Sequence, residues 1–225
     1  MELHFDQELG ELKERLLLLS SLTEQSVALA LKALVDREDA IARKVIASDT
    51  QLDRLEMEMD ERAIHLIALR QPKAKDLRFI TMAMKISNDL ERIGDQAVSI
   101  ANRAMELNKE PQLKPFEDLP KMAELAQKRI HQVLDAFVYE KLDEAREIIK
   151  LDDELDQLNR RVHRDLTNLM IENPATITRA LNLMGVARKL ERIGDHTSNI
   201  AEEIIYLFEG RDVRHNHSSE GDTQS

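Results

Sequence analysis

The 225-residue chain contains no cysteine and no tryptophan, and only 3% of its residues are aromatic. Without cysteine there is neither a disulfide nor a thiolate ligand, so any bound metal must be held by oxygen or imidazole. Because 42% of the chain is hydrophobic, aliphatic side chains must form the core. The net charge of −11 argues against binding nucleic acid through the overall field.

Long apolar runs are also missing, since no 18 consecutive residues are apolar, and we expect no transmembrane helix. The first ten residues carry Glu2, Asp6 and Glu8 without an apolar stretch, which is not the pattern of a signal peptide. These features predict a cytoplasmic protein without direct membrane insertion.

Glycine and proline are scarce, with six and five residues, and no Asn-Gly or Asp-Gly hairpin turn occurs. Helical periodicity covers most of the chain, and the prolines fall between the periodic segments. The sequence therefore predicts an all-α fold. Its six expected helices span about 5–35, 38–69, 73–107, 121–139, 143–172 and 176–208.

The hexapeptide LERIGD occurs at 90–95 and again at 190–195, 100 positions later. Such a recurrence indicates an internal repeat and hence two tandem three-helix bundles. We expect the first bundle over 1–109, a linker over 110–120 with three of the five prolines, and the second bundle over 121–209. The remaining segment, 210–225, lacks periodicity and is predicted to be disordered.

Each hexapeptide places two acids on one helix face, because Glu91 and Asp95 are four residues apart. Gly94 lies beside them in the middle of a helix, where it costs about 1 kcal/mol relative to alanine. Gly194 repeats this cost. We interpret the two glycines as points where another backbone or a ligand approaches closely. A neighbouring apolar stripe predicts the buried face of the first copy: Leu90, Ile93, Ala97 and Ile100.

A helical hairpin at Pro72 would bring two acid pairs level with each other. Asp53 and Glu91 both lie 19 residues from this proline, and Asp49 and Asp95 both lie 23 residues from it. Two antiparallel helices would thus present four carboxylates at one height, about 28 Å from the turn.

The second half repeats this construction around Pro174. Asp152 and Asp156 precede that proline by 22 and 18 residues, and Glu191 and Asp195 follow it by 17 and 21. Four converging carboxylates need a counter-charge to stay ionised together. Oxygen-rich sites suit Mg²⁺, Ca²⁺, Mn²⁺ or iron, so the sequence predicts a metal site in each half.

Other interpretations remain open from the residues alone. The acid pairs could be solvated and neutralised by Arg92 or Arg192, which would make the protein a metal-free scaffold. A metal-dependent hydrolase or oxidase built on the same carboxylates is the alternative function. The Glu-x-x-His pair of ferritin-like di-iron bundles is absent, which disfavours an oxidase. His196 points to a different face from Asp195, so we expect a capping or partner contact rather than a metal-ligand role.

The two LERIGD segments, the run ALRQPKAKDLR at 68–78 and the sequence NIAEE at 199–203 resemble the PhoU family. Its members are accessory regulators of bacterial phosphate-specific transport. The resemblance implies two tandem three-helix bundles in a homodimer, with multinuclear metal clusters on the acidic motifs and no catalysis. It also implies contacts with the ATPase subunit of a phosphate ABC transporter and with a membrane sensor histidine kinase, and negative regulation of the phosphate-starvation response.

Carried over residue by residue, the resemblance implies one metal cluster in each half, with iron as the expected metal and zinc, manganese or magnesium as alternatives. Glu56 matches a further acid of the family pattern, but its counterpart in the second half is Asn159, and Gln96 stands where the second copy has His196. With these differences, the resemblance does not imply that the two clusters are equal in nuclearity or affinity. The expected ligands are Asp49, Asp53, Glu91 and Asp95 in the first half, and Asp152, Asp156, Glu191 and Asp195 in the second.

Overall fold

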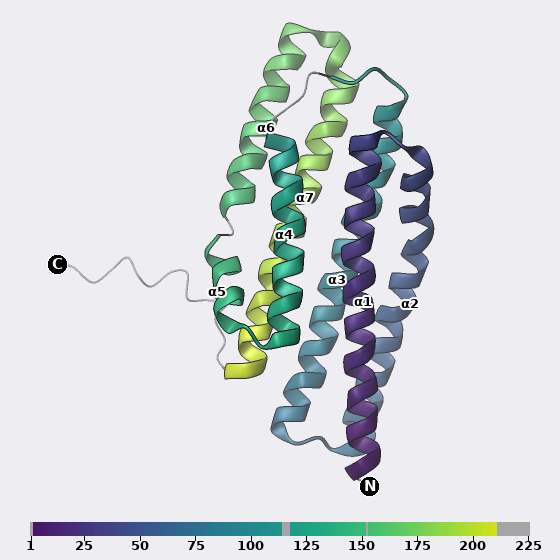
Figure 1. Ribbon diagram of the computed structural model, residues 1–225, viewed down its shortest axis with the longest axis vertical. Helices are drawn as coiled ribbons and strands as arrows, with labels where there is room; N and C mark the ends of the chain where they lie inside the picture. Colours follow the sequence, from purple (N-terminus) through teal and green to yellow (C-terminus); the bar gives the residue numbers. More distant parts are fainter. Residues whose placement is uncertain (1, 114–117, 152, 211–225) are drawn as a thin grey trace, which may run out of the picture.

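The computed structural model describes residues 2–113, 118–151 and 153–210. In this part of the chain every regular element is helical, as predicted (Figure 1). The expected disorder of the tail falls on 211–225 and therefore lies outside the described residues, as does Asp152.

Three long antiparallel helices form the first bundle: α1 (Glu2–Asp36), α2 (Asp39–Arg70) and α3 (Ala74–Asn108). The α2–α3 turn lies at Pro72, as the hairpin interpretation required, and Gln71 closes α2 in the left-handed conformation with φ 47°. The predicted apolar stripe of α3 is fully buried. Leu90, Ile93, Ala97 and Ile100 all have no exposed surface.

The second bundle contains α4 (Asp118–Tyr139), α5 (Leu142–Lys150), α6 (Asp153–Glu172), the short 3₁₀ turn η1 (Pro174–Thr176) and α7 (Ile177–Glu209). The prediction of one continuous helix over 143–172 is wrong, because the helix breaks at Leu151. The carbonyl of Leu151 accepts the amide of Glu154 in a tighter turn, at 3.1 Å, and also accepts Nη2 of Arg129 from α4.

The two bundles lie side by side with α3 packed along α7 and α1 contacting α4 (Figure 1). The two LERIGD helices are thus neighbours at the centre of the molecule. Ion pairs cross this seam, since Lys85 Nζ lies 3.0 Å from Oε1 of Glu203, whose side chain is only 9% exposed. The repeats therefore form one packed unit rather than two separate modules.

Helix α1 is the one described helix that is long and apolar enough, over His4–Asp36, to cross a membrane by length and composition. Such a result is weak evidence for a span, because the core helix of a soluble protein gives it as well. In α1 the apolar face is turned into the bundle, where Leu12, Leu16 and Leu19 are fully buried.

Candidate functional site

The first acid cluster lies where α2 and α3 face each other, at the level that the hairpin geometry predicts. Asp49 of α2 is half-buried, and its pKa is raised by burial and by the negative charges of Asp53 and Asp95. Asp95 belongs to α3, so the charges of the two helices act on each other across the hairpin. The approach of Leu52 to Gly94 confirms that these stretches of α2 and α3 lie at one level. The gathering of four carboxylates around one ion stays a prediction.

Two further carboxyls of this cluster repel their neighbours. The pKa of Glu91 is raised by burial and by Asp95, with Glu56 and Asp53 adding to the effect and Arg92 opposing it. The pKa of Glu56 is also raised, by burial and by Asp60, while a hydrogen bond from the Asn88 amide opposes the shift. The charge of Glu56 thus acts on Glu91, and its membership of a metal cluster stays a prediction.

Gly94 is required because a leucine side chain of α2 fills the space beside it. A Cβ at this position would lie 2.7 Å from Cδ1 of Leu52. Gly194 is the equivalent case, with Cδ1 of Leu155 at 2.5 Å from its hypothetical Cβ. The expectation of a backbone or ligand at these glycines is wrong, since a neighbouring side chain makes the approach. Leu52 and Leu155 each precede a cluster aspartate, so this packing also sets the height of the acids.

The second acid cluster repeats the arrangement with more positive charge around it. The pKa of Glu191 on α7 is raised by burial and by Asp156 of α6, while Arg188 and Arg192 oppose the shift. The charge of Asp156 therefore acts on Glu191 from the neighbouring helix, and the approach of Leu155 to Gly194 places these stretches of α6 and α7 at one level. Asp195 is exposed, and Asp152 lies outside the described residues.

Counter-charge at the first cluster is weak. Arg92 lies 3.6 Å from a Glu91 oxygen and 3.7 Å from an Asp95 oxygen, but its side chain is 53% exposed, and such surface pairs contribute little. Carboxylate oxygens are ligands that hard cations prefer, and a bound cation would offset the repulsion between the acids. Among the described residues, however, no three Asp, Glu or His side chains stand together in a group ready to hold one ion. The metal assignment stays a prediction.

Sequence reasoning missed the polar contacts between the halves. His196 Nδ1 lies 2.8 Å from Oδ1 of Asp89, and the Asn199 amide donates to the same oxygen at 3.3 Å. His196 therefore contacts a partner residue, as expected, but that residue is 107 positions away and no local pattern indicates it. Lys85 and Glu203 border an open acidic groove of about 470 Å³ beside these contacts, together with Glu56, Asp60, Met84, Asn88, Asp89, Asn199 and Glu202.

A second missed residue, Arg129, carries a signal in the sequence. It occupies an apolar stripe of α4 at helical spacing, with Met122, Ala126 and Val133, and its exposed fraction is 2%. An arginine at such a position is unusual, because a buried guanidinium requires partners.

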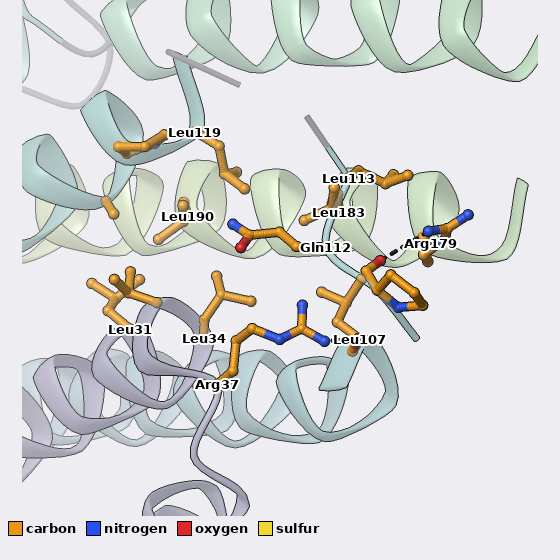
Figure 2. A pocket seen from close by; sticks show the side chains of 14 residues that line it. Leu31, Leu34, Arg37, Leu107, Gln112, Leu113, Leu119, Arg179, Leu183 and Leu190 are labelled. Atoms are coloured by element: carbon orange, nitrogen blue, oxygen red, sulfur yellow. Dashed lines mark hydrogen bonds between the residues drawn. The ribbon is translucent and has the colours of Figure 1, made fainter. Parts of the chain in front are cut away.

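An apolar cavity of about 210 Å³ lies between the bundles (Figure 2). Two arginines at its edge hold the end of α3 and the segment after it: Arg37 donates to the carbonyl of Leu107 at 2.9 Å, and Arg179 donates to that of Pro111 at 2.8 Å. Among the described residues, no carboxylate lines the cavity. Leucines dominate the wall, namely Leu31, Leu34, Leu107, Leu113, Leu119, Leu183 and Leu190.

In the described residues, fold and sequence together define an all-helical protein of two repeated bundles, each with a LERIGD helix packed against a helix that carries acidic residues. The PhoU domain model matches the chain twice, over residues 16–104 and 119–204. The chain belongs to the PhoU family.

Similar proteins cover nearly the whole chain. The protein from Pseudomonas aeruginosa named phosphate-specific transport system accessory protein PhoU homolog is 38% identical over 94% of this chain and 88% of its own length. The relative of the same name from Aquifex aeolicus is 39% identical over 95% of this chain and 97% of its own.

Solved structures agree with this assignment. The crystal structure of PhoU from Pseudomonas aeruginosa has a TM-score of 0.89 at 37% identity, covering 92% of this chain and all of that one. The phosphate transport system regulatory protein PhoU from Streptococcus pneumoniae has a TM-score of 0.86 at 31% identity, covering 93% of this chain and 99% of its own.

Proposed function

We propose that this protein is a cytoplasmic regulator of phosphate uptake and signalling. When phosphate is plentiful, it restrains uptake and represses the phosphate-starvation response. The observation that carries the proposal is the match of both repeats to the PhoU domain model. Relatives named as accessory proteins of phosphate-specific transport, aligned over 94% and 95% of the chain, support it.

The proposed partners are the ATPase subunit of a phosphate ABC transporter and a membrane sensor histidine kinase. The long polar faces of the bundles would serve as docking surfaces, and the acidic net charge of −11 disfavours nucleic acid as a partner. We expect a homodimer, and light scattering behind a sizing column measures this directly. A monomeric mass at micromolar concentration would contradict the dimer and leave the regulatory role standing.

The proposed role of the acid clusters is to hold metal ions that tie two helices of a bundle together. Asp49 and Asp53 of α2 and Glu91 and Asp95 of α3 would provide oxygen ligands in the first half. A multivalent cation supplies the counter-charge that Arg92 provides only weakly, with iron expected and zinc, manganese or magnesium as alternatives. The second half would use Asp152, Asp156, Glu191 and Asp195.

Elemental analysis of the purified protein tests the metal role. Wild-type protein should contain bound metal, and the pair of substitutions Asp53→Asn and Glu91→Gln should reduce its amount. These changes remove charge while keeping size and shape. Equal metal content in both proteins would show that Asp53 and Glu91 do not hold it, and absence of metal from both would favour the metal-free scaffold.

We propose regulation without turnover, because regulatory and accessory roles are the ones named for the relatives. Incubation of the metal-loaded protein with phosphate esters, and separately with dioxygen and a reductant, should give no product above a matched Asp53→Asn, Glu91→Gln control. Turnover that the control lacks would revive the hydrolase or oxidase alternative.

Deletion of the gene tests the regulatory role. In high phosphate, a deletion strain should express the phosphatase that marks the starvation response, and the wild-type gene supplied in trans should restore repression. A strain supplied with an empty vector is the control. Normal repression in the deletion strain would overturn the proposal.

A further inference from the structure

Two contacts between α3 and α7 change places when the internal repeat is applied. Lys85 of α3 lies 3.0 Å from Glu203 of α7. At the offset of 100, these two residues correspond to Gly185 of α7 and Arg103 of α3, which also meet. The guanidinium of Arg103 occupies the space beside Gly185 and donates to Oδ1 of Asn182 at 3.2 Å. The two halves are therefore related by an approximate two-fold rotation that exchanges the ends of the α3–α7 seam.

The open acidic groove lies at the Lys85 end of this seam. Its described lining comes from α2, α3 and α7 and contains five carboxylates and one lysine. Helices α1 and α4 contact each other and cover one side of the seam, where they lie in front of α3 and α7 in Figure 1. Since no described residue of α1 or α4 lines the acidic groove, the groove opens on the other side. A partner can therefore reach it without displacing a helix.

The repeat places an equivalent surface at the opposite end of the seam. The offset is 100 between α3 and α7, and it is 103 between α2 and α6, where Leu52 and Leu155 fill the equivalent glycine spaces. Further along these two helices, Leu55 and Leu158 are both buried at the same offset. Because the rotation exchanges α1 with α4, the equivalent surface also lies on the side that these helices leave open. Its nine residues are Ser99, Asn102, Arg103, Asn159, His163, Met184, Gly185, Arg188 and Lys189.

The charge of this equivalent surface is opposite to that of the acidic groove. Of the five acids in the groove, two correspond to cations and the other three to two asparagines and a histidine. With Arg188 in the place of Asn88, the nine equivalent residues include three permanent cations and no carboxylate. We call these three cations the basic patch: Arg103, Arg188 and Lys189.

The cations of the basic patch lie along one stretch of the seam and have no acidic partner. Arg103 contacts α7 one turn before Arg188 and Lys189. The pKa of Lys189 is lowered by burial and by the positive charges of Arg192, Arg103 and Arg188, with Asp95 opposing the shift. Among the described residues, no carboxylate lies within ion-pair distance of any of the three cations. An acidic surface on a partner would supply the missing negative charge.

We infer that the acidic groove and the basic patch together form the docking surface for a second copy of this chain. The inference rests on the proposed homodimer and identifies the face through which it forms. When two copies meet on this face with their seams antiparallel, each acidic groove lies against the basic patch of the other copy. Such a contact is isologous, because both copies use the same surface.

Charge selects this orientation of the two copies. With parallel seams, groove would face groove and patch would face patch, and the like charges would disfavour that arrangement. Salt should therefore weaken the dimer, because it screens the attraction between groove and patch. Raising NaCl from about 0.1 M to about 1 M shortens the screening length from about 10 Å to about 3 Å, and the Kd of the wild-type dimer should rise by about tenfold or more. Analytical ultracentrifugation measures this Kd.

Charge reversal in the full-length protein tests the inference directly. Asp60→Lys with Glu202→Lys reverses the acidic groove, and Arg188→Glu with Lys189→Glu reverses the basic patch. Each variant alone should dimerise at least about tenfold more weakly than wild type, because its groove and patch carry the same sign. An equimolar mixture of the two variants should form heterodimers with a Kd within about threefold of wild type, because opposite charges face each other again at both ends.

Lys44→Glu with Arg54→Glu is the matched control, because it reverses two exposed cations of α2 that lie outside the groove and the patch. Its Kd should stay within about threefold of wild type. A control that weakens the dimer as much as the basic-patch variant does would refute the inference. Circular dichroism of each variant shows whether it is folded.

The remaining outcomes separate the docking surface from the homodimer itself. Wild-type affinity in both charge-reversed variants, or folded variants that do not combine on mixing, would refute the docking surface and leave the homodimer standing. A wild-type dimer that is equally tight at both salt concentrations would refute it without any substitution. A wild-type protein that is monomeric at both salt concentrations would refute the inference together with the homodimer.

Discussion

The absence of a Cβ atom at two glycines allows close packing between the helices that carry the acids. Gly94 lets Leu52 approach α3, and Gly194 lets Leu155 approach α7. Both leucines are almost fully buried, so an added Cβ has little room to push them aside. Gly10 in α1 is the opposite case, since it is exposed and a Cβ there would meet nothing within 4 Å.

The two kinds of glycine predict opposite effects of the same substitution. Gly94→Ala gains about 1 kcal/mol in helix propensity and loses about 1–3 kcal/mol to overpacking, so we expect net destabilisation of about 1 kcal/mol. Gly10→Ala should stabilise the protein by up to about 1 kcal/mol. Urea denaturation measures both free energies of unfolding. A stabilising Gly94→Ala would show that Leu52 yields without cost.

The raised pKa values of the first acid cluster predict a pH dependence of stability in metal-free protein. For Asp49, Glu56 and Glu91 the folded state holds the proton more tightly than the unfolded state. Stability therefore falls as the pH rises from the ordinary pKa through the raised one, and the loss is complete above it. Each of these carboxylates destabilises the metal-free fold at pH 7.

Glu91→Gln mimics the protonated form and should raise the free energy of unfolding of metal-free protein at pH 7. The gain should shrink as the pH is lowered through the raised pKa and vanish below the ordinary value of 4.5. Chemical denaturation at a series of pH values measures the difference, with the exposed Glu61→Gln on α2 as the control. A gain that stays constant down to pH 4 would contradict the electrostatic origin.

At the scale of the element, α3 and α7 are the helices that join the two halves. Glu203 of α7 is buried, and both of its carboxylate oxygens lie near Lys85 Nζ of α3, at 3.0 and 3.3 Å. Burial of a carboxylate is costly unless a positive charge or hydrogen bonds compensate it. The Lys85–Glu203 pair should therefore stabilise the packing of the two bundles.

Lys85→Met should destabilise the protein by about 1–2 kcal/mol, because the ammonium that faces the buried carboxylate is lost. The magnitude is moderate because the lysine side chain is itself 43% exposed. Adding Glu203→Gln to Lys85→Met should recover most of the loss, which a double-mutant cycle measures. Lys44→Met removes an exposed lysine of α2 as the control. Additive effects of Lys85→Met and Glu203→Gln would argue against direct coupling.

At the scale of the whole molecule, acids outnumber bases by 43 to 32, and the acid clusters concentrate part of that excess between helices. A ligand that binds the folded state alone raises stability by mass action, by about 2.7 kcal/mol at 100 times its Kd. Cation binding should therefore stabilise the protein measurably, because the unfolded chain does not hold the acids together.

Removal of metal by a chelator should lower the Tm, and restored Mn²⁺ or iron should raise it again by about 5–10 °C at 100 times the Kd. Differential scanning calorimetry gives the shift. The variant with Asp53→Asn and Glu91→Gln should respond less than wild type. An identical Tm in chelator and in excess metal would speak against metal ties between the helices.

The sequence by itself determined the all-helical class, the two bundles and the level at which the acids meet. Helical periodicity and the turn at Pro72 are local properties, and together they fix which residues share a face and how far each lies from the turn. For this reason Asp53 and Glu91 could be placed opposite each other without coordinates.

Only the tertiary structure decided what covers each face. At the break, the carbonyl of Leu151 accepts a hydrogen bond from Arg129, which lies 22 positions earlier on another helix. The contact of His196 with Asp89, like the leucine beside Gly94, comes from a segment far away in the sequence. Periodicity shows that a helix face must be buried, but the identity of the covering side chain depends on how distant helices pack.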